Sequence, residues 1–485
     1  MNGLTVLSTR PLALRAATDV LTAQRLDLDF YLPERVEAED QIAAGSFRSA
    51  KLNTLRLRER PITDGIRRHD KAEDGVHLIR TQNLAGPSVA FDGTAFISEQ
   101  WHRTSLKSEV QAGDLLLAIR GYLGAAAIVR DGAPRSNINQ HIARIGVDPS
   151  KCSVGYLWAF FCSRVGRTVL ERYVTGTVQR GVTLPDLRAL RVPVPDRRIQ
   201  DYIGAKVELA ERCRSRATRL IDEANSRFNA LLATDRFRPT PALTNVVGMD
   251  HLVDRLSSEF YLPRYFDLDD HLRSVGLPVK AIDRVLRERI IRTTTPERTG
   301  DGAVPCILTS DIDPHEIRWR QPSLRVAPSV HTSHSGRLEP LDVVYTSVGP
   351  PVGEAAIVLK QFLPIAVGGD VSIIRHGEGL HPGFLSLFLN SIFGRMQNDR
   401  YSRGIRQRRV YPEDIGSFLI PLLSAKDQAL IGDRVIQYEG LNERAVDLVN
   451  EAKADVEALI AGTLDTAAII AGKLKPPRDE EALIA

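Results

Sequence analysis

The chain has 485 residues, of which 43% are hydrophobic and 26% charged, and its formal net charge at pH 7 is +4. This length allows two or three domains with separate cores, and the composition is that of an ordinary globular protein. No apolar run approaches the roughly 18 residues of a membrane span and the start lacks a signal-peptide core, so we expect a cytoplasmic protein. The four cysteines are scattered, which predicts reduced thiols and neither a zinc site nor disulfides.

An internal repeat is the strongest feature of the sequence. Residues 25–33 read RLDLDFYLP and residues 255–263 read RLSSEFYLP. Repeats are sought first in a long chain because they define its architecture. Further matches follow at a nearly constant offset: 113–116 with 341–344, 126–129 with 355–358, 176–180 with 404–408, Asp186 with Asp414, Pro193 with Pro421, and Gln200 with Gln428. We therefore predict two equivalent halves.

Each half has the same predicted order of elements. The FYLP lead-in precedes short apolar runs, such as LLLAI, AAIV, VVYTSV and DVSIIR, that are typical of strands. An apolar helix follows, over 156–170 or 384–396, and then a basic loop with glycine, a short strand that ends in proline, and a long helix. The predicted fold class is α+β, a pseudo-two-fold tandem repeat of two domains joined by two long antiparallel helices.

The first long helix is predicted over residues 196–232, with Asp196 as its N-terminal cap. Apolar residues recur every seven positions in both long helices, as in a helix that lies along another helix. One such helix alone would more simply cover its own domain, but two in one register favour packing on each other. The residues expected between the helices are Ile203, Ala210, Ala217, Ala224, Leu231, Ile431, Tyr438, Ala445, Ala452 and Leu459.

These patterns divide the chain into five predicted segments. They are a first domain with its lead-in (1–195), a central spacer helix (196–235), a second domain with its lead-in (236–423), a C-terminal spacer helix (424–462) and a flexible tail (463–485). The prolines and polar residues that follow the first long helix suit a linker, and the tail has the composition of a loose end.

Little in the sequence indicates catalysis. The phosphate loop of P-loop enzymes and the paired histidines of zinc proteases are both missing. Residues 349–352, GPPV, approach a methyltransferase motif but lack its amide or acid and its aromatic ring. Glu451 and Lys453 have the spacing of part of a nuclease carboxylate–lysine pair, but they lie on the expected exposed side of the second long helix with no strand before them. We predict no catalytic and no metal-binding residues.

Basic loops point instead to an anionic partner. Residues 400–409, RYSRGIRQRR, crowd positive charge, which is uncommon in a folded domain without such a partner. The equivalent segment 172–180 is less charged, and for both loops a solvated charged surface is the alternative. Arginine can bond guanine and the amides of Gln and Asn can bond adenine, although amides also hold turns. The candidate DNA-binding residues are Arg120, Tyr122, Asn137, Asn139, Gln140, Arg172, Thr177, Gln179, Arg180, Ser347, Arg403, Arg406, Gln407, Arg408 and Arg409.

The order and duplication of these motifs resemble the specificity subunit of type I restriction-modification systems, as a divergent member. The features that carry the resemblance occur twice: an Asp-bearing strand with a glycine turn, an aliphatic strand, an apolar helix, a Gly-x-x-Gln loop, a strand that ends in proline, and a glutamine that opens a long helix. The resemblance implies a non-enzymatic DNA reader with two target recognition domains, whose long helices set the distance between two half-sites.

The resemblance also implies partners. They are double-stranded DNA, two DNA methyltransferase subunits and a restriction and translocation subunit, with no membrane. This chain would bind no cofactor, and S-adenosylmethionine would sit on the methyltransferase. Because residues 367–370 read VGGD where 138–141 read INQH, the two domains should read different half-sites. Two alternatives stay open, namely a protein–protein scaffold of another phage-defence assembly without sequence readout, and a nuclease with an unrecognised site.

Overall fold

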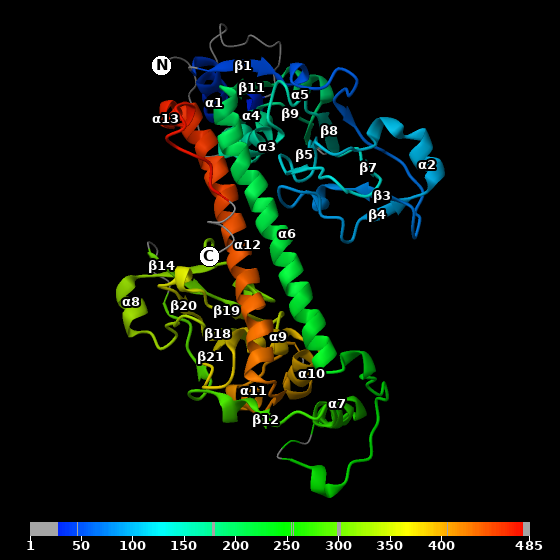
Figure 1. Cartoon of the computed structure of the whole chain (residues 1–485), viewed down its shortest axis with the longest axis vertical. Coiled ribbons are helices and arrows are strands. Elements are labelled where there is room, and N and C mark those ends of the chain that lie inside the picture. The colour runs from blue at the N-terminus through cyan, green and yellow to red at the C-terminus, as the bar shows by residue number, and fades with distance from the viewer. Residues whose placement is uncertain are drawn as a thin grey trace. The chain divides into compact units, whose positions relative to one another are not determined.

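The computed structural model describes residues 28–45, 47–176, 180–253, 255, 257–297, 302–404 and 406–478. The chain forms two compact units (Figure 1). Unit 1 holds the described residues up to Arg214 and from Arg444 onward, and unit 2 is Ser215–Glu443. Both long helices contribute to each unit, so the units do not end where the helices begin. The five predicted segments above stay a prediction.

Unit 1 combines short strands with helices. Its strands are β1 (Arg48–Lys51), β2 (Thr63–Asp64), β3 (Val76–Ile79), β4 (Ala95–Ile97), β5 (Asp114–Ala118), β6 (Ala126–Ile128), β7 (Ser136–Ile138), β8 (Ile142–Gly146), β9 (Val174–Thr175), β10 (Gly181–Val182) and β11 (Arg191–Val194). Its helices are α1 (Pro33–Ala44), α2 (Glu99–Thr104), α3 (Val154–Cys162), α4 (Arg164–Arg172), α5 (Leu184–Ala189) and α13 (Thr466–Ile470), with parts of α6 (Arg197–Leu231) and α12 (Ala425–Ala461).

Two sheets form the body of unit 1. The strands β2, β8, β5 and β6 lie in that order in an antiparallel sheet. In the other sheet, β3 pairs with β4 antiparallel and with β7 in parallel. Every residue of β5 and β8 is buried, as expected for strands that are covered on both faces.

Unit 2 repeats this arrangement. Its sheets have the orders β13-β21-β18-β19 and β17-β14-β20, and β14 pairs with β20 in parallel. Its strands are β12 (Val279–Ala281), β13 (Ile291–Arg292), β14 (Val304–Ile307), β15 (Ile312–Asp313), β16 (Glu316–Ile317), β17 (Leu324–Val326), β18 (Val343–Thr346), β19 (Ala355–Ile357), β20 (Ala366–Val367), β21 (Val371–Ile374) and β22 (Leu419–Pro421). Its helices are α7 (Pro263–Ser274), α8 (Pro328–Ser333), α9 (Pro382–Asn390), α10 (Ile392–Tyr401) and α11 (Pro412–Gly416). The predicted tandem α+β repeat is confirmed.

An apolar helix packs between sheet and long helix in each unit. In unit 1, α3 is buried over most of its length, and a Cβ on Gly155 would lie only 3.0 Å from Cα of Gly204 in α6. In unit 2, a Cβ on Gly383 of α9 would overlap the backbone of Gly432 in α12. Glycine at both crossings therefore allows the two backbones to approach closely.

The two long helices pack on each other in both units, and they run antiparallel. In unit 1, Nζ of Lys206 lies 2.7 Å from Oδ2 of Asp455. In unit 2, Arg227 pairs with Asp427 at 2.6 Å and Glu223 pairs with Arg434 at 2.9 Å. The earlier residue of α6 thus contacts the later residue of α12, as in antiparallel helices.

The local features predicted for the helices can be compared residue by residue. The predicted cap is confirmed, because Oδ1 of Asp196 accepts a hydrogen bond from the Arg198 N–H at 2.9 Å. Tyr438 and Leu231 are only half-buried, and the Tyr438 ring faces the imidazole of His315 with centroids 6.2 Å apart. The other expected packing residues are buried: Ile203, Ala210, Ala217, Ala224, Ile431, Ala445, Ala452 and Leu459.

The expected flexible tail is helical in part. Asp465 caps α13 by accepting from the Ala468 N–H at 2.9 Å, and Ile469 is buried in the core of unit 1. One apolar side chain and one capping carboxylate thus hold a segment whose composition suggested a loose end. None of the described helices combines the length and the hydropathy needed to cross a bilayer.

Candidate nucleic-acid interface

The arginine-rich loop of unit 2 is a short hairpin. The N–H groups of Arg403 and Arg409 each donate to the carbonyl oxygen of the other residue at 2.8 Å. Gly404 has φ +93°, and a Cβ there would lie 2.5 Å from the carbonyl oxygen of Gln407. The turn therefore needs glycine, which fixes the backbone on which the arginines are presented.

Two carboxylates neutralise part of the charge of this loop. Nη2 of Arg403 lies 2.8 Å from Oδ1 of Asp414, and Nη1 of Arg408 lies 3.0 Å from Oδ1 of Asp399. Both arginine side chains still expose half of their surface. The Arg408–Asp399 pair is exposed on both sides and is therefore weak, so a phosphate can replace Asp399 at little cost. Asp414 is only 8% exposed, so its pair with Arg403 costs more to break.

The other polar residues of the loop face solvent. Arg406 and Gln407 are exposed, and Arg409 donates from Nη2 to Oε1 of Gln407 at 3.3 Å. The loop therefore has a net positive charge and one amide among its arginines. Phosphate oxygens and base edges are the groups that such side chains recognise.

Two cations outside the predicted set lie beside the loop. Arg255 donates to the carbonyl oxygens of Tyr401 and Ser402 at 3.0 and 2.8 Å, and burial together with the charge of Arg403 lowers its pKa. The guanidinium of Arg292 lies 5.6 Å from the centre of the Tyr411 ring. The signal for Arg255 was present in the repeated RLxxxFYLP lead-in, but that signal did not indicate where the lead-in docks.

Backbone hydrogen bonds join three loops of unit 2 into one surface. The Gly349 N–H donates to the Arg408 carbonyl at 3.1 Å, and the Val410 N–H donates to the Ser347 carbonyl at 2.9 Å. The Ser347 N–H in turn donates to the Asp370 carbonyl at 2.9 Å. The loop that follows β18 thus lies against the arginine-rich hairpin on one side and against the loop that follows β20 on the other. Ser347 itself is buried, and its hydroxyl bonds that of Ser372 at 2.6 Å.

Unit 1 joins the equivalent three loops. The Val182 N–H donates to the Ile119 carbonyl at 2.9 Å, and Arg120 pairs in the same bridge with Gly181. The N–H groups of Ile119 and Arg120 both donate to the His141 carbonyl, at 2.9 and 3.3 Å. The structure therefore brings together, in each unit, loops that lie up to about 60 residues apart in the sequence.

Different side chains occupy this surface in unit 1. Tyr122 is 70% exposed at the tip of its loop, and Arg180 is 58% exposed with an ion pair to Asp29. Asn139 and Gln140 are half-buried, and Oδ1 of Asn139 accepts from the His141 N–H at 3.1 Å. Thr177 and Gln179 lie outside the described residues.

Like the buried Ser347, two further candidates point into the protein and are therefore removed from the interface. Asn137 is fully buried, and its amide donates to the Ser105 carbonyl at 3.0 Å and to the Ser108 hydroxyl at 2.9 Å. Arg172 is 12% exposed, pairs with Glu39, and donates from Nε to the Phe30 carbonyl at 3.2 Å. Neither side chain can reach DNA without breaking these bonds.

The role of the repeated lead-in follows from the Arg172 contacts. The guanidinium of Arg172 lies 4.3 Å from the centre of the Phe30 ring, and that of Arg400 lies 4.5 Å from the Phe260 ring. Arg400 also pairs with Asp269 at 2.7 Å. The FYLP segment thus anchors the C-terminal end of α4 in unit 1 and of α10 in unit 2, and the basic hairpin follows α10.

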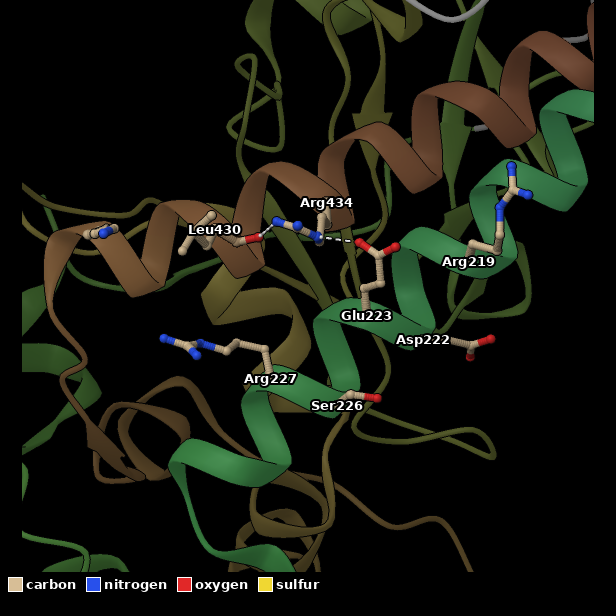
Figure 2. Close-up of a pocket in the computed structure, with 8 residues that line it drawn as sticks. Arg219, Asp222, Glu223, Ser226, Arg227, Leu430 and Arg434 are labelled. Atoms are coloured by element: carbon tan, nitrogen blue, oxygen red, sulfur yellow. Dashed lines mark hydrogen bonds and ion pairs between the residues drawn. The ribbon is translucent and has the colours of Figure 1, made fainter.

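A pocket of about 650 Å³ lies between α6 and α12 within unit 2 (Figure 2). Arg434 crosses it, pairing with Glu223 at 2.9 Å and donating to the Leu430 carbonyl at 2.6 Å. The side chain of Leu430 is 38% exposed beside these charges. The pocket is therefore lined by one partly exposed apolar side chain among charged side chains of both signs. Among the described residues, no group of three or more His, Cys, Asp or Glu could hold a metal.

Comparison with known proteins gives one curated relative and several solved structures. The specificity subunit of the type I restriction enzyme EcoBI from Escherichia coli is 26% identical over 219 residues. This match spans 44% of the present chain and 45% of the relative, so it covers about half the length of either protein. No protein-family model matches the chain. The resemblance seen in the sequence is confirmed.

Two of the solved structures to which the chain is similar are an S subunit of a type I restriction-modification system and an HsdS subunit. The S subunit from M. genitalium aligns with a TM-score of 0.47 and 11% identity, covering 87% of this chain and 96% of that one. The HsdS subunit from Thermoanaerobacter tengcongensis aligns with a TM-score of 0.29 and 16% identity, covering 86% and 97%.

Proposed function

We propose that this chain, a divergent relative of the specificity subunits of type I restriction-modification systems, is a non-catalytic DNA-recognition subunit. One observation carries the proposal. In each unit, three loops are held in one surface by equivalent backbone hydrogen bonds, while the exposed side chains of that surface differ between the units. A loop backbone that is the same in both units but carries different exposed side chains suits two domains that recognise different DNA sequences.

The chemistry of each surface supports a different half-site. In unit 2, Arg406 and Arg408 offer forked donors to phosphate or guanine, and Gln407 offers an amide to adenine. Among the described residues of the unit 1 surface, Tyr122 and Arg180 expose large side chains. Phosphate contacts would supply most of the affinity, and the base contacts would supply the discrimination. The target would be bipartite and asymmetric.

The long helices supply the docking surface for partner subunits in this proposal. Two DNA methyltransferase subunits would bind faces that the helices do not use on each other, and a restriction and translocation subunit would join for cleavage. The pocket around Leu430 and Arg434 supports this role, because it offers an apolar side chain and cations. This chain would bind no cofactor, S-adenosylmethionine would belong to the methyltransferase, and the complex would act in the cytoplasm.

Methylation mapping tests the proposal directly. The adenine methylation of the host genome is compared with and without this gene, and co-purified gene products are identified in parallel. Loss of one split, asymmetric methylated motif on deletion is the expected result, and the motif would give both half-sites and their spacing. An unchanged methylome together with a stable protein complex would refute sequence recognition for methylation and favour the scaffold alternative.

A further inference from the structure

Unit 1 contains a basic pocket outside the three loops. It has a volume of about 510 Å³ and lies between α4 and the last part of α12. Arg164 and Arg167 of α4 line one side, and Lys453 of α12 lines the other. Lys453, which was expected on an exposed face of its helix, is half-buried at this pocket.

The carboxylates at the pocket are already engaged. Oε1 of Glu457 accepts from the Arg164 N–H at 2.7 Å, and its Oε2 lies 3.9 Å from Nε of Arg164. Glu171 lies 3.9 Å from Arg35. Within the part of the chain that the structure describes, neither Arg167 nor Lys453 has a carboxylate at ion-pair distance.

Among the described residues, the pocket therefore holds two cations without an ion-pair partner. Burial and the charge of Arg167 lower the pKa of Lys453, outweighing the opposite effects of Cys162 and Glu457. The negative charge of an anion placed between the two cations would raise the pKa of Lys453 and so oppose both effects.

Two other chemical roles do not fit this pocket. Burial raises the pKa of the Cys162 thiol to about 12, so it is protonated at neutral pH and is a poor nucleophile or metal ligand. The nuclease alternative needs Glu451 beside Lys453, but Glu451 is 2.8 Å from Arg444 and 3.4 Å from Lys206. With both oxygens directed at cations, Glu451 is not available to a metal ion.

The cations of this pocket are not repeated as a set in unit 2. At a constant offset of 228 residues, Arg164 corresponds to Ile392 and Lys453 to Asn225 in unit 2. Only Arg167 has a cationic counterpart, Arg395, and that side chain donates to Oδ1 of Asn390 at 3.3 Å. The fold of unit 2 therefore forms without cations at the positions of Arg164 and Lys453.

The pocket adjoins the candidate interface of unit 1. A Cβ on Gly124, at the end of the Tyr122 loop, would lie 3.3 Å from Cγ of Arg167. We propose that Arg167 and Lys453, with Arg164 at the rim, bind a backbone phosphate of the same duplex whose bases the unit 1 loops read. The inference rests on the proposed function and extends it to a phosphate site outside the loops.

Salt dependence of binding tests this site in the complete complex. The variants Lys453→Gln and Arg167→Gln are compared with wild type on a duplex that contains the mapped target. Each variant is expected to bind more weakly on all sequences, with a slope of log affinity against log salt reduced by about 0.9 for the lost phosphate contact. Lys473→Gln removes an exposed lysine from the C-terminal segment of unit 1 and should leave the slope unchanged. Wild-type slopes in both pocket variants would overturn the site.

A lysine-acylation footprint identifies the source of the anion. Lys453 should be modified in the free complex and protected by the target duplex, but not by inorganic phosphate at the same phosphate concentration. Protection by inorganic phosphate alone would indicate a small-anion site and overturn the assignment to DNA. If the proposed function itself were wrong, the result would differ from a failure of this site, because wild type would then bind no duplex in preference to another.

Discussion

The ammonium of Lys206 lies 2.7 Å from a carboxylate oxygen of Asp455 across the facing helices of unit 1, with only 7% of the lysine side chain exposed. Burial alone would lower the pKa of Lys206, but the hydrogen bond and charge of Asp455 outweigh burial and raise it. The residue 228 positions later is Arg434, which pairs with Glu223 in unit 2 while 34% of its side chain is exposed. The repeat thus places the same kind of pair in two different environments.

Removal of the carboxylate from each pair should therefore lower the free energy of unfolding by different amounts. Asp455→Asn leaves a buried ammonium with Glu451 as its remaining partner, and we expect a loss of about 3 kcal/mol in the free energy of unfolding. Glu223→Gln breaks the exposed pair and should cost less than about 1 kcal/mol. Urea unfolding of both variants measures the difference. Equal losses would show that burial does not govern this helix contact.

Local periodicity was sufficient to predict the long helices and the repeat. The heptad positions Ala210 and Ala217 are buried as expected, and Asp196 caps its helix. These features depend on residues that are neighbours in the sequence or recur at a fixed spacing. Lys206, by contrast, gave no sequence signal, because its partner Asp455 lies far away in the chain.

The candidate interface was less predictable for the same reason. Asn137 has the residue type of an adenine reader, but a turn about 30 residues earlier in the chain surrounds its amide with Ser105 and Ser108. Arg172 is turned inward by Glu39 and Phe30, which the lead-in supplies. Residue type predicts what a side chain can bond, but long-range packing decides which partner it meets.

A buried acid in unit 2 should make stability depend on pH. Glu439 is 4% exposed, and its Oε1 accepts from the Ile357 N–H at 3.3 Å. Burial raises its pKa well above the usual value, opposed by this hydrogen bond and reinforced by Glu443 and Glu316. The folded state therefore keeps a proton that the unfolded state releases above about pH 4.5, and the free energy of unfolding falls as pH rises from there to the folded-state pKa.

Glu439→Gln removes the titration and keeps the acceptor for Ile357. The stability gain of the variant over wild type should be larger at pH 8 than at pH 5. The difference between the two gains should be about 1.4 kcal/mol for each unit of pKa shift that the substitution removes within this range. Urea unfolding between pH 5 and 8 provides the measurement. Glu378→Gln, at an exposed position of the same unit, should leave the pH profile unchanged. If the free energy of unfolding of Glu439→Gln changed with pH in parallel with that of wild type, Glu439 would not be the titrating group.

The arginine-rich hairpin should supply affinity without much sequence preference. Charge reversal of Arg406 and Arg408 replaces two exposed cations by acids, and the binding of every duplex should weaken. The slope of log affinity against log salt should fall by about 2 if each arginine neutralises one phosphate. The paired reversal of Arg284 and Arg289, which are exposed outside the three loops, serves as the control. Unchanged binding in the hairpin variant would remove this loop from the interface.

Tyr122 should act on one half-site alone. Its ring is 70% exposed at the tip of a loop whose base is fixed by the hydrogen bonds to His141, so its removal should not affect folding. An aromatic ring held in this way can stack on a base or wedge between base steps, and the loss of such a contact costs about 1–3 kcal/mol. We therefore expect Tyr122→Ala to bind the target about 10- to 100-fold more weakly, whereas Tyr122→Phe should bind like wild type.

Duplexes with a substituted half-site locate this effect. When the half-site read by unit 1 is replaced, Tyr122→Ala and wild type should bind equally weakly, because the contact is already lost. When the other half-site is replaced, the variant should remain weaker than wild type by its full factor, because Tyr122 still contacts its own half-site. A deficit of the same size on both substituted duplexes would show that the ring supports the complex as a whole and does not read a half-site.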